Sequence, residues 1–208
     1  MIARRLSLKS ARRVETVARE FQGVLLRMAD GVWRYGSNQN AFERSMVLAL
    51  SQYMRESYIA GFKYGGGNEE DLDDADESFI KSSIRTQLPY IPDFAAAVFA
   101  AVADEDAQEV IAARISMWTS NVRSMGDSGQ ASVNKNQVME FKRRPDLRNA
   151  KETCRTRGAT QGCAEMLGRR MRWKDIMARG LQVYAGNPAY ACKGWRCVHG
   201  WYPVKAAA

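Results

Sequence analysis

The chain has 208 residues, of which 46% are hydrophobic and 26% charged, and its formal net charge is +8. This length suits one domain or two small ones with a sizeable core. No apolar run approaches the roughly 18 to 20 residues that span a bilayer, so we expect no integral membrane protein and no membrane partner. The basic N-terminus lacks the short apolar core of a secretion signal, which makes a reducing cytoplasm the expected compartment.

The charge is divided unevenly along the chain. Residues 1–124 hold 15 Lys+Arg against 17 Asp+Glu, a net charge of −2, whereas residues 125–208 hold 16 against 6, a net charge of +10. A segment this basic attracts phosphate or an acidic protein surface, since each neutralised phosphate releases counterions. A solvated surface of Lys and Arg without a partner is the structural alternative.

Apolar residues spaced three and four apart predict the first two helices. One spans residues 7–33 with Ser10 as its N-cap, and the other spans residues 40–64, where Gly65 begins a run of three glycines that ends it. The short polar turn between them predicts an antiparallel helical hairpin.

An acidic segment precedes the next predicted helix. Residues 68–77 hold seven carboxylates, and they lie at the start of a helix that begins near Asp74, where negative charge is favourable. After two prolines come an alanine-rich region at residues 93–103 and a helix at residues 104–123. These elements complete a bundle of four or five helices.

The stretch SMGDSGQASVNKN, residues 124–136, is a loop by its composition and coincides with the change in charge. The domain boundary is therefore expected there. The predicted fold class is α+β, with a mainly α-helical N-terminal bundle in residues 1–124. A small, basic, turn-rich domain of mixed α/β structure, rich in Cys and Trp, is expected in residues 125–208.

The second domain has three predicted elements. Residues 137–143 alternate apolar and charged positions as a half-buried strand does, and residues 166–180 predict a short helix closed by Gly180. Residues 195–204 predict a final strand or a pair of short strands. Since this domain has few apolar residues outside its aromatic cluster, we expect its fold to need stabilisation beyond the burial of apolar side chains.

We expect this stabilisation to come from the chain's four cysteines and its only histidine. Two of the cysteines and the histidine lie in the segment CKGWRCVHGW, residues 192–201. A structural zinc ion needs four such ligands in a tetrahedron. Free buried thiols, one or two disulfides and a catalytic Cys/His pair are the alternatives. No other catalytic signature is present, so an enzyme is not expected. Four of the following five residues are the candidate zinc ligands: Cys154, Cys163, Cys192, Cys197 and His199.

Basic residues around the expected surface turns and the short helix are the candidates for contact with DNA or with an acidic partner. The aromatic side chains Trp195 and Trp201 either stack on bases or, more commonly for tryptophans beside cysteines, form the core of the domain. The basic candidates are Lys142, Arg143, Arg144, Arg148, Arg169, Arg170 and Arg172.

The run CAEMLGRRMRW at residues 163–173, followed by Gly180, Pro188 and the terminal CKGWRCVHGWYPV, resembles the end of the phage Mu F-like minor head (head morphogenesis) proteins. In that family a cysteine, a glycine and a Trp precede a proline-bearing loop that leads into a Cys-Arg-Cys or Cys-Arg-His segment. The helical first part and its acidic run are similar to the family's helical N-terminal region. The chain departs from the pattern at Thr160, where the family often has a further cysteine, and at Val198.

The resemblance implies a virion structural protein that is present in few copies and acts at or near the portal in head assembly, DNA packaging or ejection. It would be located in the virion, in the head or neck, and in the host cytoplasm during assembly. The implied partners are the portal, the major capsid protein, packaged DNA in non-specific contact, and further copies of the chain. A head-to-tail adaptor (neck) protein and a zinc-ribbon-like nucleic-acid-binding module remain alternatives.

Overall fold

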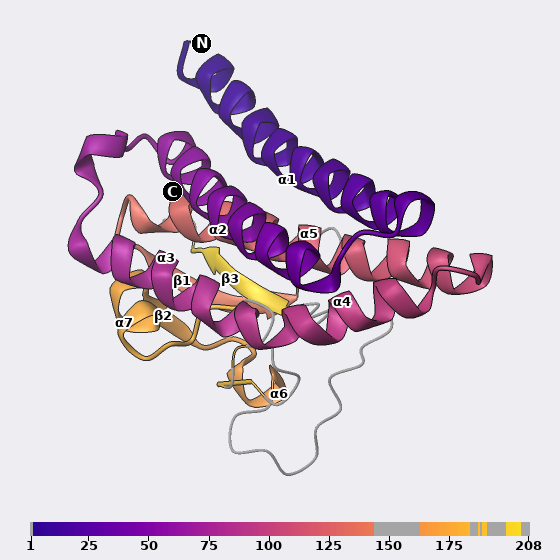
Figure 1. Ribbon diagram of the computed structural model, residues 1–208. Coiled ribbons are helices and arrows are strands. Elements are labelled where there is room, and N and C mark those ends of the chain that lie inside the picture. The colour runs from indigo at the N-terminus through magenta and orange to yellow at the C-terminus, as the bar shows by residue number, and fades with distance from the viewer. Residues whose placement is uncertain (1, 144–162, 184–186, 188, 191–198, 205–208) are drawn as a thin grey trace. The chain divides into compact units, whose positions relative to one another are not determined.

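The computed structural model describes residues 2–143, 163–183, 187, 189–190 and 199–204, and the side chains of residues 2–12, 163 and 164 are outside this description. The chain divides into two compact units, Met1–Gln130 and Ala131–Ala208. The first unit is helical, and the second contains a small antiparallel sheet (Figure 1). The predicted α+β fold with a mainly helical N-terminal part is confirmed.

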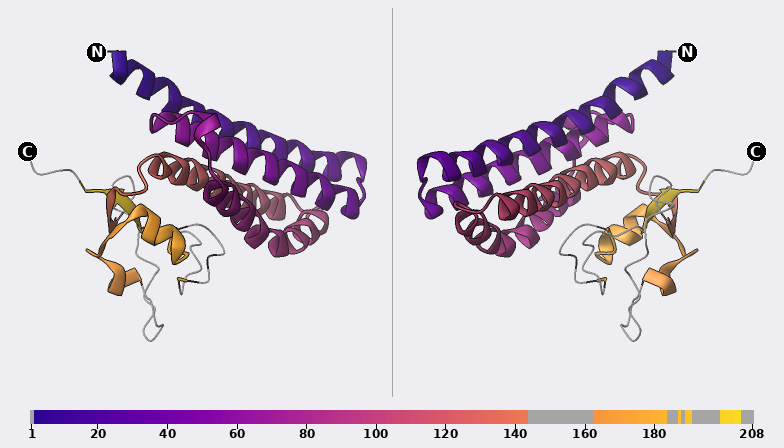
Figure 2. Two further views of the ribbon diagram at one scale, coloured as in Figure 1. Left: turned by 90° about the vertical axis from the view of Figure 1, so that its left-hand side faces the viewer. Right: turned by 90° about the vertical axis from the view of Figure 1, so that its right-hand side faces the viewer.

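Helices α1, Ile2–Tyr35, and α2, Gln39–Tyr64, lie side by side as an antiparallel hairpin (Figure 2). The Asn38 side chain caps α2 by accepting a hydrogen bond from the backbone of Ala41. The expected start of the first helix was wrong, because Ser10 lies inside α1 and not at its N-cap. The preceding residues are mostly good helix formers, so nothing in their propensity stops the helix there.

The acidic segment caps helix α3, Asp74–Gln87, after a short 3-10 helix, η1, at Glu69–Asp71. Asp73 accepts hydrogen bonds from two backbone N–H groups of the first turn, and the Asp76 carboxylate accepts one from the backbone of Asp73. This reciprocal capping box satisfies backbone donors that a helix start leaves open. The predicted start near Asp74 is confirmed.

Helix α4, Ile91–Ala100, follows the 3-10 helix η2, Leu88–Tyr90, and helix α5 spans Glu105–Ser132. The expected loop at residues 124–136 was therefore wrong over most of its length. Its serines remain compatible with the helix, since the hydroxyls of Ser124 and Ser128 donate to backbone carbonyls four residues earlier. The two glycines of this stretch have a packing role.

Close packing of α5 against α1 and α2 explains those glycines. A Cβ on Gly129 would lie 2.0 Å from the carbonyl oxygen of Tyr58, and a Cβ on Gly126 would lie 2.5 Å from a methyl carbon of Val14. The hydroxyl of Ser57, on α2, donates to the carbonyl of Val122, on α5, at 2.6 Å. Glycine here permits backbones to approach each other and does not signal a turn.

The sheet of the second unit has the strand order β2-β1-β3, and both pairings are antiparallel. Strand β1 is Val138–Arg143, β2 is Arg170–Arg172 and β3 is His199–Pro203. The strand predicted at residues 137–143 is confirmed, and so is the final strand over the residues that the structure describes.

The prediction of one helix over residues 166–180 was wrong in its first half. Helix α6, Cys163–Met166, is followed by strand β2, and only Trp173–Ala178 form helix α7. Hydrogen bonds between the backbones of Phe141 and residues 168 and 169 hold this segment to β1. Gly180 closes α7 as predicted, with a φ of 62° that favours glycine.

One face of the sheet packs on the core of the second unit. Phe141 is at its centre, stacked on Tyr190 with ring centroids 5.8 Å apart and in edge contact with Trp201 at 5.2 Å. The Trp201 indole N–H donates to the carbonyl of Leu181 at 2.7 Å. This side chain is therefore part of the domain core, as its commoner interpretation predicted. The buried members of the cluster are Met139, Phe141, Met166, Trp173, Ile176, Leu181 and Tyr190.

Candidate functional site

Strand β2 carries the arginines of the candidate site on its exposed side. Because side chains alternate along a strand, Arg170 and Arg172 project to one face and Met171 to the face that packs on the core. The register places Arg170 opposite Glu140 and Arg172 opposite Val138 on β1. As β2 is at the edge of the described sheet, both arginines are accessible from two sides.

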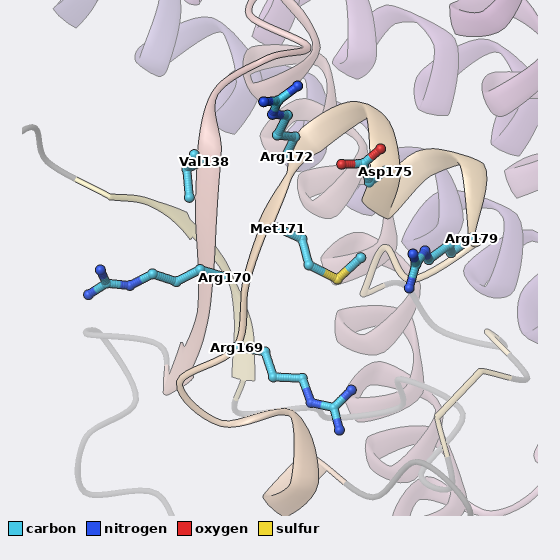
Figure 3. Close-up of a pocket in the computed structure, with 7 residues that line it drawn as sticks. All are labelled: Val138, Arg169, Arg170, Met171, Arg172, Asp175 and Arg179. Atoms are coloured by element: carbon cyan, nitrogen blue, oxygen red, sulfur yellow. The ribbon is translucent and has the colours of Figure 1, made fainter.

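Helix α7 forms the other side of the site. Arg179 is its C-cap residue, and its backbone N–H contacts the carbonyl of Asp175. Together with β2 this helix borders an open groove of about 500 Å³. The Asp175 and Arg179 side chains lie on one side of the edge strand and the Arg170 side chain on the other (Figure 3). We call this groove the arginine groove, and its lining residues are Val138, Arg169, Arg170, Met171, Arg172, Asp175 and Arg179.

The arginine groove is strongly positive. Four arginines and one carboxylate, that of Asp175, are among its lining residues, and the four guanidinium groups point in different directions (Figure 3). Arg169 is oriented by a hydrogen bond of 3.0 Å from its Nε to the carbonyl of Glu165, and Arg170 lies 3.7 Å from the Glu140 carboxylate. Guanidinium groups present paired donors that match phosphate and carboxylate oxygens. The excess of positive charge therefore favours anionic partners around this edge of the sheet.

Three of the predicted basic residues come together in this groove, namely Arg169, Arg170 and Arg172. They lie on a turn and a strand and not on the predicted helix. Sequence reasoning missed Arg179, although its place at the end of the apolar run before Gly180 was a usable signal, since basic residues favour helix C-termini.

The other predicted basic residues are placed differently. Lys142 is exposed on β1, on the same face of the sheet as Arg170. Arg143 is half-buried, directly opposite His199, and its Nε is buried. Arg144 and Arg148 lie outside the described residues.

The predicted zinc ligands are largely beyond what the structure describes. Cys154, Cys192 and Cys197 lie outside the described residues, and Cys163 begins α6 without a described side chain. His199 is buried and stacks on Phe141, with ring centroids 5.8 Å apart. Within the described part of the chain no three His, Cys, Asp or Glu side chains group as metal ligands do. The zinc site stays a prediction.

Comparisons with protein-family models, with curated proteins and with solved structures gave no match to this chain. Among the helices that the structure describes, none combines the length and the apolar character that crossing a membrane requires.

Proposed function

We propose that this chain is a structural protein of a phage head, of the minor head (head morphogenesis) kind, and not an enzyme. It acts at or near the portal during head assembly, DNA packaging or ejection. Two features support the proposal: the terminal motif around Gly168, Trp173 and Gly180, and the positive charge concentrated in the C-terminal half.

Among the structural observations, the arginine groove supports the proposal most strongly. Four arginines, from β2, the turn before β2 and the end of α7, lie around one edge of the sheet, where their charge favours phosphate oxygens or an acidic protein surface. A phage head contains both kinds of partner: packaged DNA supplies phosphates, and portal or capsid protein supplies protein surfaces. The helical unit supplies the remaining protein contacts in this proposal.

The proposal is tested with heads assembled in the presence of a tagged chain. The tagged chain should sediment with heads and should bind isolated portal or major capsid protein of the same virus. A variant with alanine at Arg169, Arg170, Arg172 and Arg179 should bind more weakly, whereas Lys174→Ala, an exposed cation outside the groove lining, should bind normally.

The salt dependence of binding to duplex DNA provides a quantitative measurement for the same proposal. If four arginines each displace a counterion, raising the salt from 50 to 200 mM weakens binding by roughly 100-fold. A zinc-ribbon-like module without a role in the virion would keep its DNA affinity but would not sediment with heads. Failure to bind heads, portal, capsid protein and DNA at low salt would overturn the proposal.

A further inference from the structure

The side of the sheet that faces away from the core shares Val138, Arg170 and Arg172 with the arginine groove. It also carries an aromatic side chain, Tyr202, that does not line the groove. The register aligns Arg170, Glu140 and Tyr202 in one row across the three strands, and places Lys142 opposite Gly200 in the next row. We call this surface the outer face, and its residues are Val138, Glu140, Lys142, Arg170, Arg172, Gly200 and Tyr202.

Tyr202 lies down along its own strand. A Cβ built on Gly200 would be 3.2 Å from Cε2 and 3.4 Å from the hydroxyl oxygen of Tyr202, so the far end of the ring passes over Gly200. The missing side chain of the glycine gives the ring room to lie close to the sheet.

The ammonium group of Lys142 lies against one side of the Tyr202 ring. The Nζ of Lys142 lies over the Tyr202 ring, 5.6 Å from its centroid, within the range of a cation–π contact. Because Lys142 is exposed, this side of the half-buried ring is reached from solvent. A flat group can approach by the same route while the long lysine side chain moves aside.

One cation, Lys142, contacts the ring, the Glu140 carboxylate lies directly opposite Tyr202, and two further cations lie across the sheet on β2. Arg170 and Arg172 are exposed on β2 at one border of the outer face, and Lys142 is exposed on β1. The Glu140 carboxylate, directly opposite Tyr202, lies 3.7 Å from Arg170, which offsets its charge. Anionic groups are therefore attracted to Lys142 on the central strand and to the two arginines on β2.

We propose that the outer face binds unpaired nucleic acid, with a base stacked on Tyr202 and the flanking phosphates held by Arg170, Arg172 and Lys142. Proteins that bind single strands combine aromatic stacking surfaces with basic residues that follow the backbone, and sheet faces serve this purpose. This inference rests on the proposed function, because it specifies the form of nucleic acid that the basic unit recognises.

The alternatives explain fewer of these features. A duplex keeps its bases stacked inside, so it would use the arginines but would leave the ring without a role. An acidic peptide would likewise need the cations alone. The combination of an aromatic ring, a glycine beneath it and cations on β1 and β2 fits a single strand best.

The test uses the full chain and two fluorescein-labelled probes, a 12-nucleotide single strand and the blunt duplex of the same sequence, in an anisotropy titration. The single strand should bind at least several-fold more tightly than the duplex. Tyr202→Ala should weaken single-strand binding about tenfold, because one stacked base is lost, and Tyr202→Phe should stay within about twofold. Duplex binding should change by less than about twofold in both variants.

Three variants at other positions test the inference without changing Tyr202 itself. Lys142→Glu changes an exposed side chain and should weaken single-strand binding, whereas Lys174→Glu, the same charge change on exposed α7, should have a smaller effect. Gly200→Val should act like Tyr202→Ala, since the added side chain displaces the ring. Far-UV circular dichroism verifies that each variant is folded.

Equal affinity for the two probes, with Tyr202→Ala binding both normally, would overturn the inference and leave the head-protein proposal intact. Binding to portal or capsid protein without binding to either probe would have the same consequence. Loss of binding to heads, portal, capsid protein and both probes together would overturn the head-protein proposal as well.

Discussion

Gly61 of helix α2 and Gly126 of helix α5 lie so close together that a Cβ on Gly61 would be 1.8 Å from the carbonyl oxygen of Gly126. The obstacle is backbone and not a flexible side chain, so it cannot move without separating the two helices. Gly61→Ala is therefore expected to destabilise the helical unit by about 3 kcal/mol, at the upper end for overpacking a core. Urea denaturation monitored by far-UV circular dichroism measures this change.

The control for Gly61→Ala is Gly31→Ala in helix α1. A Cβ on Gly31 would meet only the Ser37 hydroxyl at an ordinary 3.8 Å. This variant should gain roughly 0.5 to 1 kcal/mol, because alanine is the better helix former. If Gly61→Ala were as stable as Gly31→Ala, the close approach of the α2 and α5 backbones would be contradicted.

The buried carboxylate of Asp76 links helices α2 and α3. It accepts a hydrogen bond of 2.7 Å from the hydroxyl of Tyr58, and neither side chain is exposed. Tyr58→Phe should cost about 1 to 3 kcal/mol, since a buried acceptor loses a partner without gaining water. Asp76→Ala should cost more, because it also removes the capping bond to the backbone of Asp73.

Equilibrium unfolding of Tyr58→Phe, Asp76→Ala and the double variant measures the coupling between the two residues. Direct contact predicts that the double variant is less destabilised than the sum of the single variants. Strictly additive costs would contradict the hydrogen bond.

The pair Glu15 and Arg123 should make stability depend on pH. Arg123 donates two hydrogen bonds of 2.8 and 2.9 Å to the Glu15 carboxylate, which lowers the pKa of Glu15 below its ordinary value of 4.5, and Arg19 lowers it further. A pKa that is lower in the folded protein means that the ionised pair stabilises the fold above pH 4.5. This contribution is lost as the pH falls through the folded pKa.

Glu15→Gln should therefore be destabilised by about 0.5 to 1 kcal/mol at pH 7, the range for a partly exposed pair, and by less at pH 3. Urea titrations at the two pH values measure the difference. Glu20→Gln removes an exposed carboxylate from the same helix and serves as the control. A loss of stability in Glu15→Gln that stayed constant between pH 7 and pH 3 would contradict the assignment.

The cysteine prediction is tested by metal content. If four of the five candidate ligands hold zinc, the purified chain contains one zinc ion per molecule, and a strong chelator lowers its melting temperature by roughly 10 °C or more. Cys163→Ser and Cys192→Ser should each lose the metal. His199→Ala is less informative, because the imidazole also packs on Phe141. A metal-free chain with an unchanged melting curve would favour packed thiols.

The sequence by itself determined the features that depend on neighbouring residues. Helix α2 ends at its glycines, α3 starts at Asp74 behind an acidic cap, and β1 alternates as predicted. Caps, turns and periodicity act within a few residues, so they can be read directly from a single chain. The charge of the C-terminal half is likewise a property of composition.

Tertiary structure decided the rest, because the deciding contacts join residues far apart in the chain. Gly126 and Gly129 resemble loop residues until helix α2 is brought against them, and residues 170–172 become a strand because β1 offers backbone partners. The arginine groove and the position of Tyr202 over the outer face follow from strand register, which local patterns do not set. The sequence identified most of the basic residues, and the fold determined which of them lie together.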